Sequence, residues 1–181
     1  MNNLKIYFTC LILCLFVVQA QGQAQAQNLK IAVVDVEKIL SVSSAGKSIQ
    51  SQLKTKRESF QKEFSTREDN LMISQKALIK QKTELSAEEF TSKRKSFEQQ
   101  LLETRNLFQK RRKSLDKGLS NALAQLRKHI INVEAEVSNE EGYQMVLTRD
   151  SVVIVEKEID ITDTVLTRLN ANVSNISINA N

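Results

Sequence analysis

The sequence predicts a mainly helical α+β fold, in which a long antiparallel helical hairpin projects from a small β-rich head. Three observations predict it. In a stretch of about ninety residues the apolar side chains recur at helical spacing, and the stretch contains no proline. A strong helix start signal, "LSAEEF" at residues 85–90, interrupts that stretch in its middle. Short β-branched runs lie on both sides of the helical stretch.

The N-terminal residues 1–26 have the features of a secretory signal peptide. Lys5 precedes the short apolar run "IYFTCLILCLFVV", and small-residue sites follow, the last of them at Ala26. The run is too short to span a bilayer as a mature helix, although an uncleaved anchor is the alternative. Both cysteines of the chain, Cys10 and Cys14, lie in this segment. We therefore expect a mature chain without disulfides or cysteine metal sites.

The first predicted element of the mature chain is a buried strand. The segment "LKIAVVD", residues 29–35, is rich in β-branched side chains, which favour strands. The following "VEKIL" could form one helical turn. Ser43 or Ser44 could then cap the N-terminus of the long helix that follows. We assign residues 27–46, together with residues 119–172, to a discontinuous head.

The first long helix is predicted from about residue 46 to residue 83. Its apolar residues form two heptad rows that polar side chains interrupt, a pattern typical of a thin and imperfect coiled coil. These apolar residues are Ile49, Leu53, Phe60, Phe64, Leu71 and Leu78.

The stretch "LSAEEF" predicts that a second helix begins in the middle of the helical region. Ser86 and Glu89 have the spacing of a capping box, in which each side chain accepts a hydrogen bond from the other residue's backbone amide. Leu85 and Phe90 flank it as a hydrophobic staple. We therefore expect the chain to turn back near residues 84–87, at the tip of an arm formed by residues 47–118.

The second long helix is predicted from Ala87 to about Glu141, with Gly142 as the residue that ends it. Its apolar seam changes phase near Gly118, which we consider a hinge candidate, with tolerated loose packing as the alternative. A fold at the tip leaves residues 126–137 without a partner in the first helix. Because this surplus is the more apolar end, we expect it to pack in the head.

The C-terminal part predicts a strand hairpin, a short helix and a tail. Residues 143–148 and 152–155 are β-branched runs that flank the loop "RDS". A short amphipathic helix follows at about residues 160–170, capped by Asp160 or Thr162, and the polar residues 173–181 are expected to be disordered. Three short strands form a poor core, so we expect oligomerisation through the strand part.

Charge is unevenly distributed along the chain. Residues 47–137 contain twenty Lys and Arg but twelve Asp and Glu, whereas residues 138–181 contain three basic and seven acidic residues. A basic helical region is typical of nucleic-acid binding, but an exported protein rarely meets nucleic acid. A solvated, lysine-rich helix face is the simpler interpretation.

Taken together, these segments resemble the Skp/OmpH family of periplasmic chaperones. The resemblance covers about residues 29–170, through "LKIAVVDVEKIL", "SAGK", the basic helical hairpin and "GYQMVL…VVIV…DITDTVLTRLN". The head motifs are the more specific part, because the arms match only in length, charge and heptad character. The Asn-rich tail has no expected counterpart in the family.

The resemblance implies a homotrimer in which three chains join through a trimerisation head and three helical arms surround a cavity. Such proteins hold unfolded outer-membrane proteins in the periplasm without ATP. Head residues implied in the trimer are Ile31, Val33, Met145, Leu147, Val153 and Val155. Client-binding residues implied on the arms are Phe60, Phe64, Leu71, Leu78, Phe90, Phe97, Lys76, Lys80, Lys82, Lys93, Arg94 and Lys95. For the apolar ones, a role in the seam between the two helices is the alternative.

Catalysis has little support in the sequence. The chain contains no phosphate-binding, zinc-protease, serine-hydrolase or CxxC motif, and His129 is its only histidine. We expect no enzyme activity, cofactor, metal, nucleic-acid partner or small-molecule substrate. Two other functions remain open: an exported structural coiled-coil or adaptor protein of the cell envelope, and contact of the basic arms with anionic envelope lipid.

Overall fold

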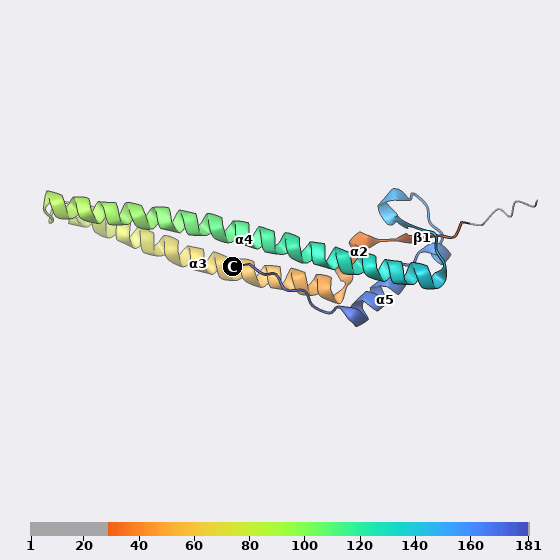
Figure 1. The fold of residues 1–181 in the computed structure, drawn as a ribbon. Coiled ribbons are helices and arrows are strands. Elements are labelled where there is room, and N and C mark those ends of the chain that lie inside the picture. Colours follow the sequence, from red (N-terminus) through yellow and green to blue (C-terminus); the bar gives the residue numbers. More distant parts are fainter. Residues whose placement is uncertain (1–28, 181) are drawn as a thin grey trace, which may run out of the picture.

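The computed structural model describes residues 29–180, and the expected signal peptide, residues 1–26, lies outside them. Figure 1 shows two long helices that form an arm, with the other elements gathered at one end. In chain order the elements are β1 (Ile31–Val34), α2 (Val36–Val42), α3 (Ser44–Gln81), α4 (Ala87–Glu141), β2 (Met145–Thr148), the 3-10 turns Arg149–Ser151 and Lys157–Ile159, and α5 (Thr162–Asn172).

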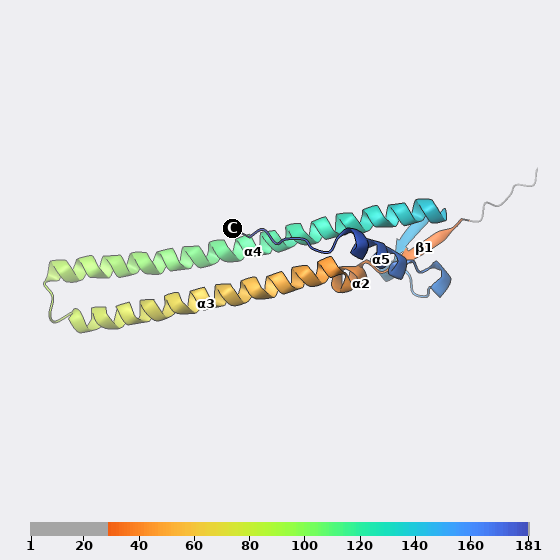
Figure 2. The ribbon, with the colours of Figure 1, turned by 90° about the horizontal axis from the view of Figure 1, so that it is seen from below.

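The predicted antiparallel hairpin is confirmed. Helices α3 and α4 run side by side, and a short turn joins them at the end far from the head (Figure 2). The ring centroid of Phe108 lies 5.1 Å from that of Phe60 and 4.4 Å from that of Phe64. Phe64 and Phe108 are about equally far along the chain from the predicted turn, as expected for an antiparallel hairpin that turns there.

The capping box at the arm tip is confirmed as well. The Ser86 hydroxyl accepts a hydrogen bond from the Glu89 amide at 3.3 Å, and Glu89 Oε2 accepts from the Ser86 amide at 3.0 Å. Ser43, one of the two predicted caps, accepts from the Gly46 amide at the start of α3 in the same way. At its other end, α4 stops at Gly142, whose positive φ of 72° is the left-handed conformation that glycine adopts readily.

The surplus end of α4 forms the centre of the head, as predicted. Leu126, Ile130, Val133 and Val137 are all buried. They belong to one core with buried residues of β1, α2, the start of α3 and α5, namely Ala32, Val34, Ile39, Leu40, Ile49, Val165 and Leu169. The longer of the two arm helices therefore connects the arm to the head by burying its own apolar end.

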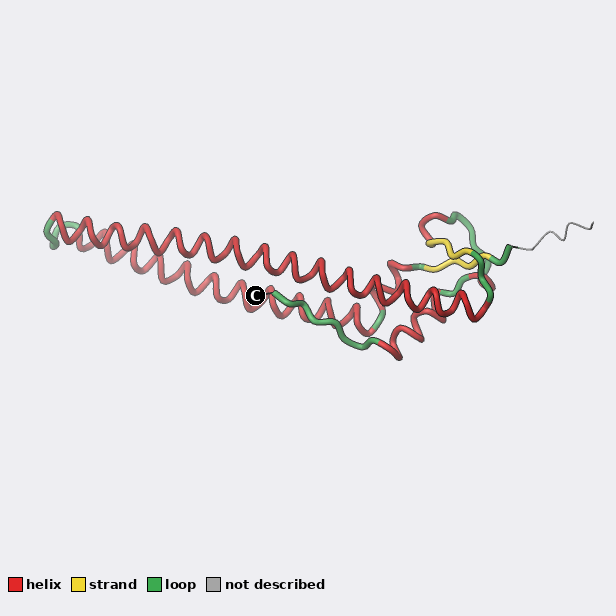
Figure 3. The backbone as a smooth tube through the Cα atoms, in the orientation of Figure 1, coloured by secondary structure: helices red, strands yellow, loops and turns green. Residues whose placement is uncertain are grey.

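The predicted three-stranded, β-rich head is wrong. Strands β1 and β2 pair in parallel, from Ile31 with Met145 to Val34 with Thr148, and form a two-stranded sheet (Figure 3). Residues 152–155 are not a strand, and "RDS" is a 3-10 turn instead of a hairpin loop. The other edge of β1 forms a single bridge with Asp160. Helices α2 and α5 and the end of α4 supply most of the head.

The parallel pairing is consistent with the connection between the two strands. A parallel partner needs a long crossover connection, and here the whole α2–α3–α4 segment supplies it between β1 and β2. The 3-10 turn after β2 then directs the chain away from the sheet. In the single chain Val153 and Ile154 consequently pair with no strand and are 96% and 85% exposed.

The prediction that the residues after α5 are disordered is also wrong for residues 173–180. Residues 173–180 run from α5 back along the base of the arm (Figures 1 and 3). Ile176 and Ile178 are buried there and belong to the main core. The composition of the tail is polar, but its two isoleucines at alternate positions pack in the core, and hydrogen bonds from Gln52 also hold it.

Helix α5 lies where the sequence predicts it. It spans Thr162–Asn172, and its apolar face, Ile161, Val165 and Leu169, is buried. Asp160 Oδ1 accepts a hydrogen bond from the Thr162 amide at 3.0 Å at the start of the helix. Among residues 29–180, no helix combines the length and the apolar character that crossing a membrane requires.

Candidate functional site

The outer half of the arm carries a group of exposed basic side chains, which we call the tip cluster. Its members are Lys76, Lys80, Lys82, Lys93, Arg94 and Lys95, the six basic residues predicted as client-binding. Lys93 Nζ donates to Gln81 Oε1 at 2.8 Å, and Arg94 forms an ion pair with Glu98 at 3.6 Å. Within residues 29–180, no hydrogen bond or ion pair engages the other four side chains.

The nearby acidic residues compensate this charge only in part. Glu84, Glu88 and Glu89 lie at the turn itself. The hydrogen bond from the Ser86 hydroxyl, with a smaller effect of the Ser86 amide, lowers the pKa of Glu89. The carboxylate is therefore ionised and engaged in capping α4. The tip cluster accordingly presents a positive surface to any ligand that approaches the arm.

The six apolar residues predicted as client-binding lie in the seam between α3 and α4. Each of them is half-buried, so none is a fully buried core residue and none belongs to the exposed apolar residues. Phe60 and Phe64 contact Phe108, and Leu78 and Phe97 line one shallow cavity. The seam is thus thin along most of the arm, as the interrupted heptad rows predict.

A second set of apolar residues was missed by the sequence analysis. Met72, Ile73 and Ile79 of α3 and Leu102 of α4 are 46%, 62%, 67% and 57% exposed. The first three lie one or two positions after the seam residues Leu71 and Leu78 in the sequence. Heptad analysis finds side chains that face the partner helix, so apolar residues outside the two rows escape it. Their presence on a solvated helix face is the signal that could have found them.

A second basic group lies on α4 nearer to the head. Lys110, Arg111, Arg112 and Lys113 are consecutive and all exposed. Arg111 forms an ion pair with Glu63 of α3 at 3.9 Å, and Glu63 also pairs with Arg67 at 3.4 Å. Four consecutive basic residues are a simple sequence signal, but the predicted set of client-binding residues does not include them.

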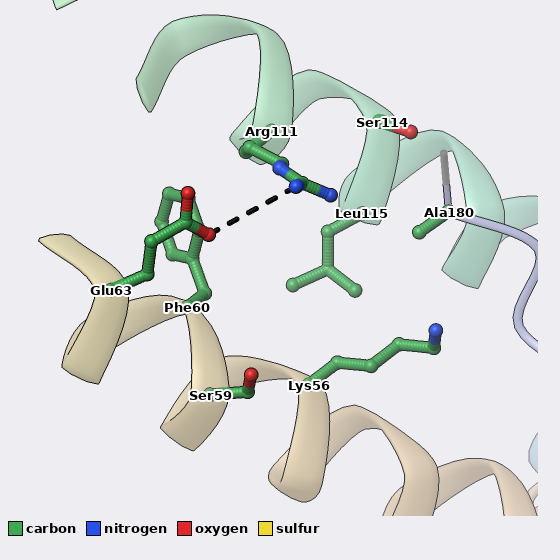
Figure 4. Close-up of a pocket in the computed structure, with 8 residues that line it drawn as sticks. All are labelled: Lys56, Ser59, Phe60, Glu63, Arg111, Ser114, Leu115 and Ala180. Atoms are coloured by element: carbon green, nitrogen blue, oxygen red, sulfur yellow. Dashed lines mark ion pairs between the residues drawn. The ribbon is translucent and has the colours of Figure 1, made fainter. Parts of the chain in front are cut away.

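A cavity of about 200 Å³ opens between the helices near this group. Figure 4 shows Phe60 and Leu115 along its apolar side and Lys56 and Arg111 at its rim, with the dashed Glu63–Arg111 ion pair across it. Ala180, at the end of the tail, borders the cavity on another side (Figure 4). The arm therefore offers a concave site here besides its exposed faces.

Gly118, the hinge candidate, lies where the tail crosses α4. A Cβ atom on this residue would lie 2.8 Å from the carbonyl oxygen of Asn179 and 3.1 Å from Cγ2 of Ile178. Close approach of a backbone is one established reason for a glycine in a helix. This contact explains the residue without motion, and the hinge stays a prediction.

The head residues predicted for trimerisation fall into two groups. The paired strands bring four of them together, Ile31 opposite Met145 and Val33 opposite Leu147. Val33 is only 1% exposed in the single chain, so its contacts are largely intramolecular. Val153 and Val155 lie outside the sheet, and the first of these is almost fully exposed.

The part of the chain that the structure describes offers no group of side chains typical of a metal site. No three His, Cys, Asp or Glu side chains of residues 29–180 lie close enough to hold a metal ion. His129 lies on an exposed position of α4. What the described residues do present is an elongated surface with exposed basic and apolar side chains.

Comparison with known proteins agrees with this geometry. A family model described as outer membrane protein (OmpH-like) matches residues 30–169. The fold is similar to the crystal structure of a candidate outer membrane chaperone (OmpH-like) from Caulobacter crescentus, with a TM-score of 0.78 and 19% sequence identity over 83% of this chain and 89% of that chain. No curated protein matches the sequence significantly.

Proposed function

Because the chain belongs to the OmpH-like family, we propose that it is an ATP-independent holdase chaperone that binds unfolded outer-membrane proteins in the periplasm. The observation that carries the proposal is the composition of the arm surface. Exposed apolar residues, such as Ile73 and Ile79, lie on the same outer half of the arm as the tip cluster. A ligand that has both apolar residues and acidic groups would find partners for both there.

The physical basis of such binding is many weak contacts. An unfolded barrel protein exposes alternating apolar residues and unpaired strand edges, which aggregate readily. Exposed ion pairs contribute about 0–1 kcal/mol each, so a single ion pair is too weak to bind a client. Several arms that act together give useful avidity while each contact stays easy to break. This combination suits a protein that must later release its client without ATP.

We expect the client affinity to fall as ionic strength rises. Charges on the solvated arm are screened beyond about 8 Å at physiological salt, and further screening weakens each contact. The measurement is a titration of fluorescent, urea-unfolded barrel protein with the mature chain at 50, 150 and 500 mM NaCl. Affinity that does not change with salt would contradict the electrostatic part of the proposal.

A homotrimer would complete the site, because a single arm encloses no cavity for a client. The support on this chain is the apolar surface of the head, where Val153 and Ile154 are 96% and 85% exposed and Met145 is 45% exposed. Apolar side chains of this kind at the end of an open two-stranded sheet are typical of an interface between chains. Residues 27–46 and 119–172 would form this head, and residues 47–118 the arm.

The alternative function is that of an exported structural or adaptor coiled coil, and anionic envelope lipid is a further candidate ligand for the tip cluster. Analytical ultracentrifugation of the mature chain, alone and with urea-diluted barrel protein, separates these functions. We expect a trimer that shifts to a larger complex with the client. A monomer that forms no complex would reject the proposal. Binding to anionic vesicles with no binding of client would favour the lipid.

A further inference from the structure

Residues 173–180, which we call the tail, lie against α3 and α4 at the base of the arm, and we call the surface of the two helices that they cover the groove. Figures 1 and 2 show the tail leaving α5 and running back along both helices. The family model ends at residue 169, so the tail lies beyond the matched region. Its side chains alternate: Ile176 and Ile178 are 6% and 3% exposed, whereas Ser177 and Asn179 face solvent.

Gln52 of α3 binds the backbone of the tail as a neighbouring strand would. Its Nε2 donates to the carbonyl oxygen of Ile176 at 2.8 Å, and its Oε1 accepts from the amide of Ile178 at 3.0 Å. One donor and one acceptor on alternate residues of an extended segment is the hydrogen-bond pattern of a β-ladder. These two bonds involve main-chain atoms, so they are available to extended segments of many sequences.

Gly118 forms the opposite wall of the groove. Gly118 has no side chain, so the backbone of Asn179 can pass close to α4. A Cβ atom on Gly118 would lie 2.8 Å from the carbonyl oxygen of Asn179. Ile178 Cγ2 would lie 3.1 Å from the same Cβ. The groove is therefore wide enough for an extended backbone, because α4 has a glycine at the crossing point.

The groove adjoins a cavity between the two helices. Ala180 borders this cavity of about 200 Å³, which also has Phe60 and Leu115 in its lining (Figure 4). An apolar cavity of about 150 Å³ holds a benzene molecule, so this one has room for a large apolar side chain. Lys56 and Arg111 at its rim add positive charge. A segment longer than the tail could therefore bind along the same line.

We propose that this groove is a binding site for extended peptide segments with apolar residues at alternate positions, and that the tail occupies it as an intramolecular competitor. The inference rests on the proposed function, because the strands of outer-membrane barrels have this alternation. Gln52 and Gly118 are the specificity-determining residues, and they select an extended backbone. A client segment enters the groove only when the tail leaves it, so the tail lowers the affinity of the site.

The first test uses the mature chain truncated after Asn172 and a fluorescent synthetic peptide of residues 173–181. Anisotropy should show that the peptide binds the truncated protein at least about tenfold more tightly than the full-length protein. Gln52→Ala in the truncated protein should weaken binding about tenfold, since it removes both backbone hydrogen bonds. A control peptide with Ser177 and Ile178 exchanged should bind as weakly.

A synthetic nine-residue peptide that alternates Ser and Ile tests whether the groove accepts other sequences. It should displace the tail peptide from the truncated protein. Absence of tail-peptide binding, or binding of the tail peptide that the alternating peptide does not displace, would overturn the inference. In the second case the groove would be a slot for the tail alone.

A second variant tests the inference in the full-length chain, in case truncation disturbs folding. Ser48 Oγ donates to Asn175 Oδ1 at 2.6 Å, so these two side chains are in contact, and Ser48→Cys combined with Asn175→Cys introduces a pair of thiols there. Oxidation should lock the tail and abolish binding of the alternating peptide, and reduction should restore it. Ser48→Cys alone is the matched control. Equal binding in the oxidised and reduced forms would contradict the competition.

Aggregation assays with urea-diluted barrel protein separate failure of this inference from failure of the proposed function. Suppression of aggregation without peptide binding in the groove would refute the inference and leave the chaperone function intact. Absence of suppression by the full-length chain would refute the chaperone function, whatever the peptides do.

Discussion

Glu134 of α4 is a residue in the head whose ionised side chain lowers the stability of the fold. Its Oε1 is buried and, within the described residues, accepts no hydrogen bond, and burial raises the pKa of the carboxyl. A carboxyl whose pKa is higher in the folded chain than in the unfolded chain destabilises the fold while it is ionised. The penalty is present at neutral pH, decreases as the pH falls through the folded-state pKa, and is gone below the unfolded-state pKa.

Glu134→Gln should therefore raise the Tm at pH 7.5, on the order of 2 °C, because it removes the charge and keeps the shape. The difference from the unmodified chain should shrink as the pH falls toward 4. Thermal unfolding by circular dichroism at fixed protein concentration measures it. Glu136→Gln, at an exposed position of the same helix, is the control. A lower Tm at pH 7.5 would show that the carboxylate has a favourable partner in the assembled protein.

Substitution of Gly118 tests whether this glycine is needed for the close approach of the tail backbone or for hinge motion of the arm. In the full-length chain, Gly118→Ala places a Cβ 2.8 Å from the Asn179 carbonyl oxygen and should destabilise the fold. In the chain truncated after Asn172 the same change should stabilise it by about 1 kcal/mol, the usual gain of alanine over glycine in a helix. Chemical unfolding of the four proteins gives both values. A destabilisation that persists after truncation would contradict the close-approach explanation.

At the scale of the element, the capped start of α4 defines the tip of the arm. Ser86→Ala should destabilise this helix terminus by about 1 kcal/mol, because the amide of Glu89 loses its acceptor. Hydrogen exchange at the amides of residues 88–91 should then accelerate, while exchange near Gly118 stays unchanged. Ser92→Ala, an exposed change one turn further into α4, is the matched control. Equal exchange in both variants would show that the cap contributes nothing.

The elements that the sequence predicts well are those whose signals are local. The cap at Ser86, the end of α4 at Gly142 and the helical spacing of both arm helices all depend on residues within a few positions of one another. The unpaired length of α4 also follows from counting residues after the turn. These features together predict the arm, its register and its attachment to the head.

The elements that the sequence predicts poorly depend on distant partners. Residues 152–155 have strong strand propensity, but a strand also needs a neighbouring strand to pair with. The strand that pairs with β2 is β1, which the whole arm separates from it in sequence. The tail has a disordered composition, and only the position of Gln52 and the glycine on α4 reveal where Ile176 and Ile178 bind. The exposed apolar residues on the arm escaped for a related reason, because a heptad pattern describes the seam alone.

At the scale of the whole molecule, the proposed trimer would join three arms through the head. Val153→Asp with Ile154→Asp should dissociate the proposed trimer, because both side chains are exposed in the single chain and an interface would bury them. The mass in solution should fall to that of one chain, while the helical circular dichroism signal stays. Glu156→Lys with Glu158→Lys, exposed in the same loop, is the control. An unchanged mass would place the interface elsewhere.

The measurement that tests the central claim most directly is light scattering of a urea-unfolded outer-membrane barrel protein diluted into buffer without ATP. With the mature chain present at one trimer per client, we expect scattering to stay near its starting value at 150 mM NaCl. Scattering should return when the six basic residues of the tip cluster are changed to glutamine. Full aggregation in the presence of the unmodified chain would contradict the account.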